Sequence, residues 1–171
     1  MKITKSKEVY RCSLFSVTEN EATDRTGWKL KRNVVRHPGS AVMMAVDADN
    51  RVMLVKQYRL PADRYLWELP AGKIDEGETA FAAAKRELVE ETGLRAKKWK
   101  RLVEFYPSPG FLEEKMTIYL VTELKQGESK PMDDERIETR WFTKKELREA
   151  IRKNSIRDAK TMIAFLHWAR L

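Results

Sequence analysis

The chain has 171 residues, a hydrophobic fraction of 42% and a formal net charge of +8. This length suffices for one domain with a real hydrophobic core, and the composition excludes a disordered chain. No apolar run approaches the roughly 20 residues that span a bilayer, and the charged N-terminus lacks the apolar stretch of a signal peptide. The single cysteine, Cys12, excludes an internal disulfide and favours a reducing, cytoplasmic location.

The excess positive charge is spread over three stretches, residues 25–36, 95–101 and 140–153. Solvated surface is the simpler interpretation of such runs. The alternative is a positive field that attracts a phosphate-bearing substrate, either a small molecule or RNA.

The first 37 residues predict a small β-structure ahead of the main domain. Residues 9–17 alternate loosely, residues 19–27 are polar and rich in turn formers, and residues 28–35 are again extended. Pro38-Gly39 then interrupts the pattern. We therefore expect an N-terminal β extension over residues 1–37 and a main domain over residues 38–171.

The main domain mixes strands and helices without a regular β-α-β alternation. The clearest helix is expected over Thr79–Thr92, with helix formers throughout and Gly93 as its stop. Strands are expected at residues 40–46, 52–58, 67–69, 98–106, 116–121 and 138–142, and further helices at 144–153 and 158–169. This order favours an α+β fold, or a sandwich around a mixed sheet, over a doubly wound fold.

Three glutamates of the predicted helix carry the first chemical signal. Glu87, Glu90 and Glu91 stand at i, i+3 and i+4, so they share one helix face and repel one another. Such a cluster suits a hard cation such as Mg²⁺, which takes oxygen ligands. A solvated acidic face beside Lys85 and Arg86 explains the glutamates alone equally well. The two histidines, His37 and His167, are far apart in sequence, which argues against zinc.

A longer motif decides between these two interpretations. From Gly72 the spacing is Gly-x5-Glu-x7-Arg-Glu-apolar-x-Glu-Glu-x-Gly-apolar, ending at Leu94, and every defined position is met. This pattern resembles the Nudix box. The resemblance implies a loop–helix–loop that grips a metal against a mixed sheet flanked by helices, an α/β/α sandwich.

The same resemblance assigns roles to residues of the motif. Glu87 and Glu91 would be the principal ligands of Mg²⁺ or Mn²⁺, with Glu90 supplementing them and the carbonyl of Ala71 adding a backbone ligand. Arg86 and Glu78 would brace the loop and orient the ligands.

Sequences outside the box indicate the substrate. Residues 55–59, 68–72, 106–110 and 155–161 resemble the ADP-ribose pyrophosphatase branch of the family. Pro109, some fifteen residues beyond the box, is the feature most associated with ADP-ribose hydrolysis, although an ordinary turn proline is the alternative. Ser155 or Asp158 could instead simply cap the last helix. Relatives that act on GDP-mannose and other nucleotide sugars share much of this pattern.

Several flanking residues are candidates for substrate contacts. Arg59, just after a strand, could clamp phosphate through its guanidinium, or be an ordinary surface arginine. Ser108 lies in the branch-like run around Pro109. Glu114 is a candidate for the terminal ribose or a further metal contact, with an exposed loop carboxylate as the alternative. Trp28 stands where relatives place an aromatic that stacks on adenine, often across a dimer interface; simple packing in the hairpin is the alternative.

The catalytic base is expected outside the box, whose glutamates are committed to metal. In the branch that this chain resembles, the catalytic carboxylate comes from a later loop. The acidic run Asp133-Asp134-Glu135 is the matching position, and Glu135 is our choice among its three carboxylates. On composition alone, a solvated loop accounts for this run nearly as well.

The resemblance implies hydrolysis of ADP-ribose to AMP and ribose 5-phosphate by a homodimer that the N-terminal sheet holds together. An RNA 5′-end pyrophosphohydrolase would suit the isoelectric point near 9.6, but no aromatic-rich basic stripe is obvious, so nucleic acid is not the expected partner. A non-catalytic nucleotide-sugar sensor is disfavoured by the intact box and by the lack of chain for a DNA-binding domain. We expect no membrane association.

Overall fold

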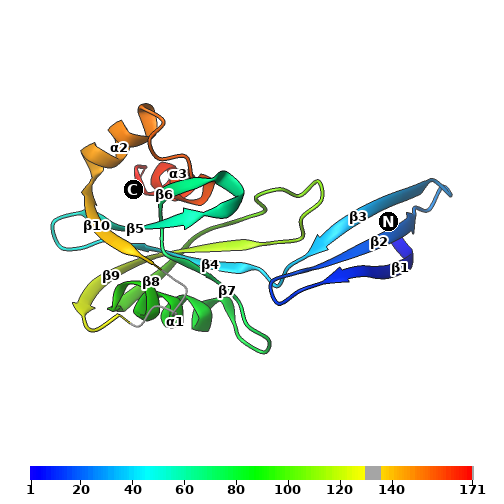
Figure 1. Cartoon of the computed structure of the whole chain (residues 1–171), viewed down its shortest axis with the longest axis horizontal. Helices are drawn as coiled ribbons and strands as arrows, with labels where there is room; N and C mark the ends of the chain where they lie inside the picture. Colours follow the sequence, from blue (N-terminus) through cyan, green and yellow to red (C-terminus); the bar gives the residue numbers. More distant parts are fainter. Residues whose placement is uncertain (130–135, 171) are drawn as a thin grey trace.

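The computed structural model describes residues 1–129 and 136–170, and it confirms the expected α+β fold with an antiparallel sheet at the N-terminus. Figure 1 shows the N-terminal sheet projecting from the main body, where α1 lies on one side of the strands and α2 and α3 lie on the other. Among the described helices, none combines the length and the apolar character needed to cross a membrane.

The N-terminal sheet contains β1 (Lys2–Arg11), β2 (Ser16–Thr23) and β3 (Lys29–Arg36), in that order. The prediction of a turn-rich segment over residues 19–27 was wrong for its first half, because β2 is the central strand and pairs on both sides. Its glutamates face lysines of the flanking strands, with Glu21 opposite both Lys5 and Lys31. Opposite charges on neighbouring antiparallel strands stabilise this sheet, although the polar composition of β2 by itself disfavours a strand.

The main body has two sheets. The first has the order β7 (Ala71–Lys73), β4 (Ser40–Ala45), β9 (Met116–Gln126) and β8 (Leu94–Phe105), and its β4–β9 pair is parallel. The second has the order β10 (Glu138–Thr143), β5 (Arg51–Arg59) and β6 (Arg64–Glu68). The sequence patterns missed β7, which is only three residues long and follows Pro70, and underestimated the lengths of β8 and β9.

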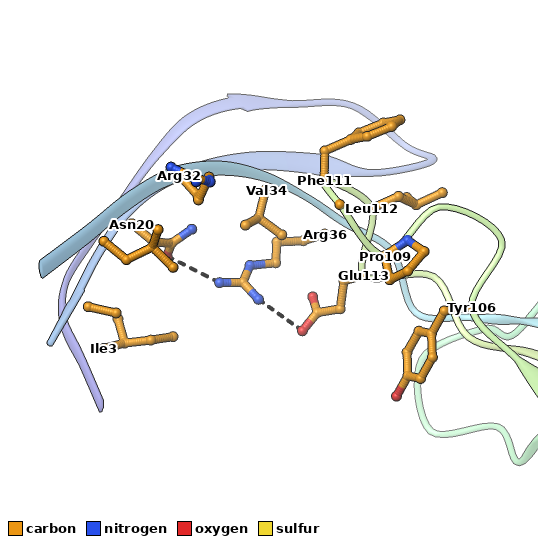
Figure 2. A pocket seen from close by; sticks show the side chains of 13 residues that line it. Ile3, Asn20, Arg32, Val34, Arg36, Tyr106, Pro109, Phe111, Leu112 and Glu113 are labelled. Atoms are coloured by element: carbon orange, nitrogen blue, oxygen red, sulfur yellow. Dashed lines mark hydrogen bonds and ion pairs between the residues drawn. The ribbon is translucent and has the colours of Figure 1, made fainter. Parts of the chain in front are cut away.

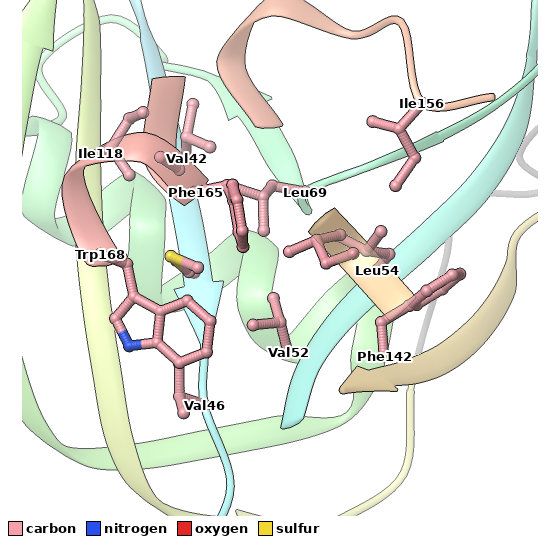
Figure 3. Packing of buried hydrophobic residues seen from close by; sticks show 13 residues of the cluster. Val42, Val46, Val52, Leu54, Leu69, Ile118, Phe142, Ile156, Phe165 and Trp168 are labelled. Carbon is pink, nitrogen blue, oxygen red and sulfur yellow. The ribbon is translucent and has the colours of Figure 1, made fainter. Parts of the chain in front are cut away.

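Strand β4 forms the middle layer of the sandwich, since all six of its residues are buried. Successive side chains of a strand point to opposite faces. Val42 and Met44 accordingly pack with Phe165 and Trp168 of α3 (Ala159–Trp168), as Figure 3 shows for the labelled side chains. Ala41, Met43 and Ala45 pack on the other face, with Ala83, Ala84 and Leu88 of α1 (Ala80–Thr92).

Local signals fix the ends of the helices. The Thr79 hydroxyl accepts a hydrogen bond from the Ala82 amide at 3.1 Å, and Gly93 ends α1 with a φ of 72°. A capping box of Thr143 and Glu146 begins α2 (Lys144–Arg152), and Asp158 caps α3. These caps satisfy amides that have no partner inside the helix. Asp158 therefore has the capping role that we had considered for it.

The N-terminal sheet is tied to the loop between β8 and β9. Val35 of β3 accepts from the Glu113 amide at 2.9 Å and donates to the Phe111 carbonyl at 2.8 Å. Arg36 donates to Glu113 at 2.9 Å and to Asn20 at 3.1 Å, as Figure 2 shows. An apolar pocket of about 490 Å³ lies between the sheet and this loop, and Pro109 lines it. The sheet thus helps to hold the loop that carries the branch-like residues.

Candidate active site

Arg86 is the centre of an ion network between α1 and β7. Its Nη1 donates to Glu87 at 2.6 Å and to Glu90 at 3.1 Å, and its Nη2 and Nε donate to Glu78 at 2.9 and 3.2 Å. Nη2 also donates to the carbonyl of Lys73 in β7 at 3.1 Å. The Glu78 carboxylate, followed by Glu87, raises the pKa of Arg86, and Arg86 in turn lowers the pKa of Glu78. A bracing role of Arg86 and Glu78 would use these contacts, and that role stays a prediction.

Glu87 and Glu91 are buried against β7, with 7% and 4% of their surfaces exposed. Glu87 lies over Gly72, where an added Cβ atom would stand 1.9 Å from the Glu87 carboxylate carbon. Glu91 accepts a hydrogen bond from the Ala71 amide at 3.2 Å. A glycine at position 72 is therefore needed because the carboxylate of Glu87 occupies the space of a side chain.

These residues bring together oxygen atoms of the type that a hard divalent cation binds. Burial of a carboxylate costs free energy unless a positive group compensates it, and Arg86 supplies part of that compensation for Glu87 and Glu90. In the described part of the chain, no group of three or more acidic, histidine or cysteine side chains is arranged to hold a metal ion. Carboxylates beside the backbone of Ala71 are nevertheless the ligand types that Mg²⁺ and Mn²⁺ prefer.

A pocket of about 620 Å³ adjoins the box at Ala71, Gly72 and Lys73. Such a volume suits a small ligand. Its remaining lining comes from the N-terminal sheet and its turn, β5 and β6, the β8–β9 loop and the start of α3: Leu14, Phe15, Val35, His37, Ser40, Arg59, Leu66, Glu68, Phe111, Leu112, Glu114, Met116, Asp158 and Lys160. Residues distant in sequence thus meet beside the glutamate helix.

Arg59 enters this pocket as part of a chain of four charged residues, which we call the ion chain. Arg59 Nε donates to Glu68 at 2.7 Å, Lys160 Nζ donates to the other oxygen of Glu68, and Lys160 also donates to Asp158 at 2.9 Å. Burial disfavours the charge of Arg59, but Glu68, with help from Glu91 and Asp158, keeps the pKa of Arg59 above its usual value. Arg59 is therefore a cation held beside the box.

Glu114 lines the opposite wall of the pocket. Its carboxylate accepts from the Ser40 hydroxyl at 2.5 Å and lies 3.8 Å from His37 Nδ1, and only 13% of its side chain is exposed. Burial lowers the pKa of His37, against the attraction of Glu114. His37 Nδ1 accepts from the Gly39 amide at 3.1 Å, a hydrogen bond that the neutral imidazole with its proton on Nε2 can make. Glu114 is thus a mostly buried carboxylate of the pocket wall and not an exposed loop carboxylate.

The other predicted site residues lie outside the pocket lining or outside the described residues. Trp28 lies at the β2–β3 turn, 58% exposed, and is absent from the pocket lining in the described chain. Ser108 accepts from the amides of Phe111 and Leu112, so its carbonyl shapes the loop. Glu135, the predicted base, and its neighbours Asp133 and Asp134 lie outside the described residues.

Sequence reasoning gave no site role to several residues that line the pocket, among them Leu14, Phe15, Ser40, Glu68 and Lys160. Lys73 donates to the carbonyl of Ser13 at 3.1 Å, which holds the β1–β2 turn against β7. Glu68 and Lys160 lay within runs already singled out as branch-like, so a signal existed for those two. Leu14 and Phe15 carried none, because an apolar pair in a polar strand region resembles ordinary packing.

Comparisons with known proteins bear on the family and the fold of this chain. A family model described as NUDIX domain matches residues 35–165. The ADP-ribose pyrophosphatase of Bacillus subtilis (strain 168) is 39% identical over 136 residues, which cover 78% of this chain and 74% of that protein. The methanol dehydrogenase activator of Bacillus methanolicus is 32% identical over 165 residues, which cover 95% of this chain and 89% of that protein. The crystal structure of an ADP compounds hydrolase aligns with a TM-score of 0.82 and 24% sequence identity, covering 99% of this chain and 94% of that chain. At this identity, the likeness shows the fold alone.

Proposed function

This chain belongs to the Nudix family as a pyrophosphatase-type hydrolase, and we propose that it cleaves the pyrophosphate bond of a nucleoside diphosphate sugar. ADP-ribose, giving AMP and ribose 5-phosphate, is the leading substrate. The observation that carries this proposal is the pocket in which Arg59 stands beside Ala71 and Gly72, next to the buried glutamates of α1. The guanidinium of Arg59 would bind the phosphates of such a substrate, and the neighbouring carboxylates would bind the metal ion that accompanies them.

Different residues would contact different parts of such a substrate. Arg59 binds a phosphate oxygen, because a guanidinium pairs with phosphate through two parallel hydrogen bonds. Glu114, fixed by Ser40, accepts hydroxyl hydrogens of the sugar. Leu14 and Phe15 offer an apolar wall to a base or sugar face. Glu135 remains our choice for the carboxylate that removes a proton from the attacking water.

We place Mg²⁺ or Mn²⁺ at Glu87, Glu91 and the Ala71 backbone, with Glu90 in support. When bound, a divalent cation neutralises the phosphate charge that develops during hydrolysis. The support is the donor set itself, two buried carboxylates held against β7.

The metal assignment predicts a large effect of Glu91→Gln. The amide keeps an acceptor for the Ala71 amide but loses the charge, so we expect the fold to persist while kcat/KM falls about 100-fold or more. Binding of Mn²⁺, measured by calorimetry, should weaken in parallel. Glu128→Gln, an exposed change, is the matched control. Full activity and unchanged Mn²⁺ binding in Glu91→Gln would refute the assignment.

The substrate is tested by one panel of compounds with Mg²⁺ or Mn²⁺: ADP-ribose, GDP-mannose, dinucleoside polyphosphates, oxidised dGTP and 5′-triphosphate RNA. We expect the highest kcat/KM on ADP-ribose. GDP-mannose is the second candidate, because a GDP-mannose pyrophosphatase of Cronobacter sakazakii is 31% identical over 147 residues. Absence of turnover on every sugar-linked diphosphate would reject the proposal, and selective turnover of RNA would replace it.

We also propose that the protein is a homodimer joined through the N-terminal sheet. This sheet projects from the main body (Figure 1) and exposes large apolar side chains: Ile3, Val9, Tyr10 and Trp28. Exposed apolar surface of this kind favours association. A second subunit would also bring Trp28 toward a pocket other than its own, as expected for adenine stacking.

A further inference from the structure

Glu68 is a buried carboxylate that has two cations as partners. Only 1% of the residue is exposed, and one carboxylate oxygen accepts from Arg59 Nε at 2.7 Å while the other accepts from Lys160 Nζ. Lys160 is itself 6% exposed and its second partner is Asp158. The four formal charges of the ion chain sum to zero. All four residues line the pocket beside the box.

The contacts leave one end of Arg59 available. Glu68 engages Arg59 through Nε, and the described residues supply no hydrogen-bond acceptor to its terminal Nη nitrogens. Because Lys160 shares the charge of Glu68, Arg59 is not the sole counter-ion of this carboxylate. We propose that Glu68, with its charge balanced by Lys160, is a positioning residue that orients Arg59 so that its Nη nitrogens bind the pyrophosphate group. This inference rests on the proposed function.

A purely structural role is the competing explanation, in which the ion chain only attaches α3 to β6. The attachment of α3 does not depend on Lys160, however. The Leu69 amide donates to the Thr161 hydroxyl at 2.9 Å, and Asp158 accepts from the amide and the hydroxyl of Thr161 at 2.9 and 2.6 Å. Buried ion pairs are moreover poor stabilisers compared with apolar packing. Lys160 therefore has a charge that the attachment of the helix does not require.

A double-mutant cycle between Lys160 and Arg59 tests the proposal. The readouts are the Kd of inorganic pyrophosphate by calorimetry in EDTA, and kcat and KM on whichever nucleotide sugar is turned over. We expect Lys160→Met to weaken pyrophosphate binding about tenfold and to raise KM more than it lowers kcat. In the Arg59→Met background, Lys160→Met should add less than about a twofold effect, because the two residues act as one unit. Lys160→Arg should restore most of the binding.

Lys145→Met is the matched control, since it removes the same charge from an exposed position on α2. Equal losses of pyrophosphate binding with and without Arg59 would overturn the proposal, because Lys160 would then act independently of Arg59. A lower unfolding temperature with unchanged pyrophosphate binding would also overturn it, as would failure of the unmodified protein to bind pyrophosphate. If the cycle shows coupling but no nucleotide sugar is hydrolysed, only the proposed function fails.

Discussion

At the scale of single residues, the box depends on a position where one side chain takes the space that another side chain would need. Glu87 fills the volume that a side chain at position 72 would need. Arg86 joins Glu78, Glu87 and Glu90 and so keeps three carboxylates together. The box is therefore a packing unit as well as the proposed set of metal ligands.

Gly72→Ala should separate function from folding. The added Cβ atom would lie 1.9 Å from the Glu87 carboxylate, which is the far end of a flexible side chain and can move away. We expect kcat/KM to fall at least about tenfold, because a displaced ligand weakens metal binding, with an unfolding temperature within a few degrees of the original. Gly110→Ala, where no atom lies within 4 Å of an added Cβ, controls for the extra methyl group. Unchanged activity would show that Glu87 need not occupy this space.

At the scale of elements, α1 must end at a fixed point for its glutamates to face β7. Gly93 provides this end in a left-handed conformation, with φ of 72°, and its amide donates to the Val89 carbonyl at 2.8 Å. The carbonyl of Gly93 accepts from the Gly127 amide at 2.9 Å, which joins the helix end to the end of β9.

Gly93→Ala should destabilise the protein by about 2–4 kcal/mol, from left-handed strain and a steric clash. The added Cβ atom would stand 2.5 Å from the Gly127 carbonyl oxygen and 2.8 Å from the Ser129 amide nitrogen, both backbone atoms. Gly27→Ala is the matched control, since its φ is 88° but nothing lies within 4 Å of its Cβ position. Its cost should be about 1–2 kcal/mol, from strain alone. Urea unfolding measures both, and equal losses would contradict the steric argument.

At the scale of the whole molecule, the pocket exists because three parts of the chain meet. The N-terminal sheet supplies Leu14 and Phe15, the main body supplies Arg59, and the last helix supplies Lys160. Backbone hydrogen bonds of Val35 hold the sheet to the β8–β9 loop, so the sheet belongs to the site even within one chain.

The proposed dimer predicts a solution mass of about twice 20.1 kDa, measured by light scattering after size-exclusion chromatography. Ile3→Lys places a charge on the exposed apolar face of the sheet and should shift the mass toward one chain. Asn33→Lys adds a charge at an exposed position of β3, on the face opposite to Leu30, the residue that pairs with Ala22 next to Ile3, and is the matched comparison. A single-chain mass for the unmodified protein would contradict the dimer.

The amino-acid sequence by itself determined the fold class, the glutamate helix and its end at Gly93, and the family. These features are local or follow fixed spacings, because helix periodicity places Glu87 and Glu91 on one face without reference to the rest of the chain. Only the tertiary structure decided which other residues share the pocket. Arg59, Glu68 and Lys160 are up to 101 positions apart and meet through the packing of α3 against β6. No local pattern encodes such a contact, so the partners of Arg59 became visible only in the folded chain.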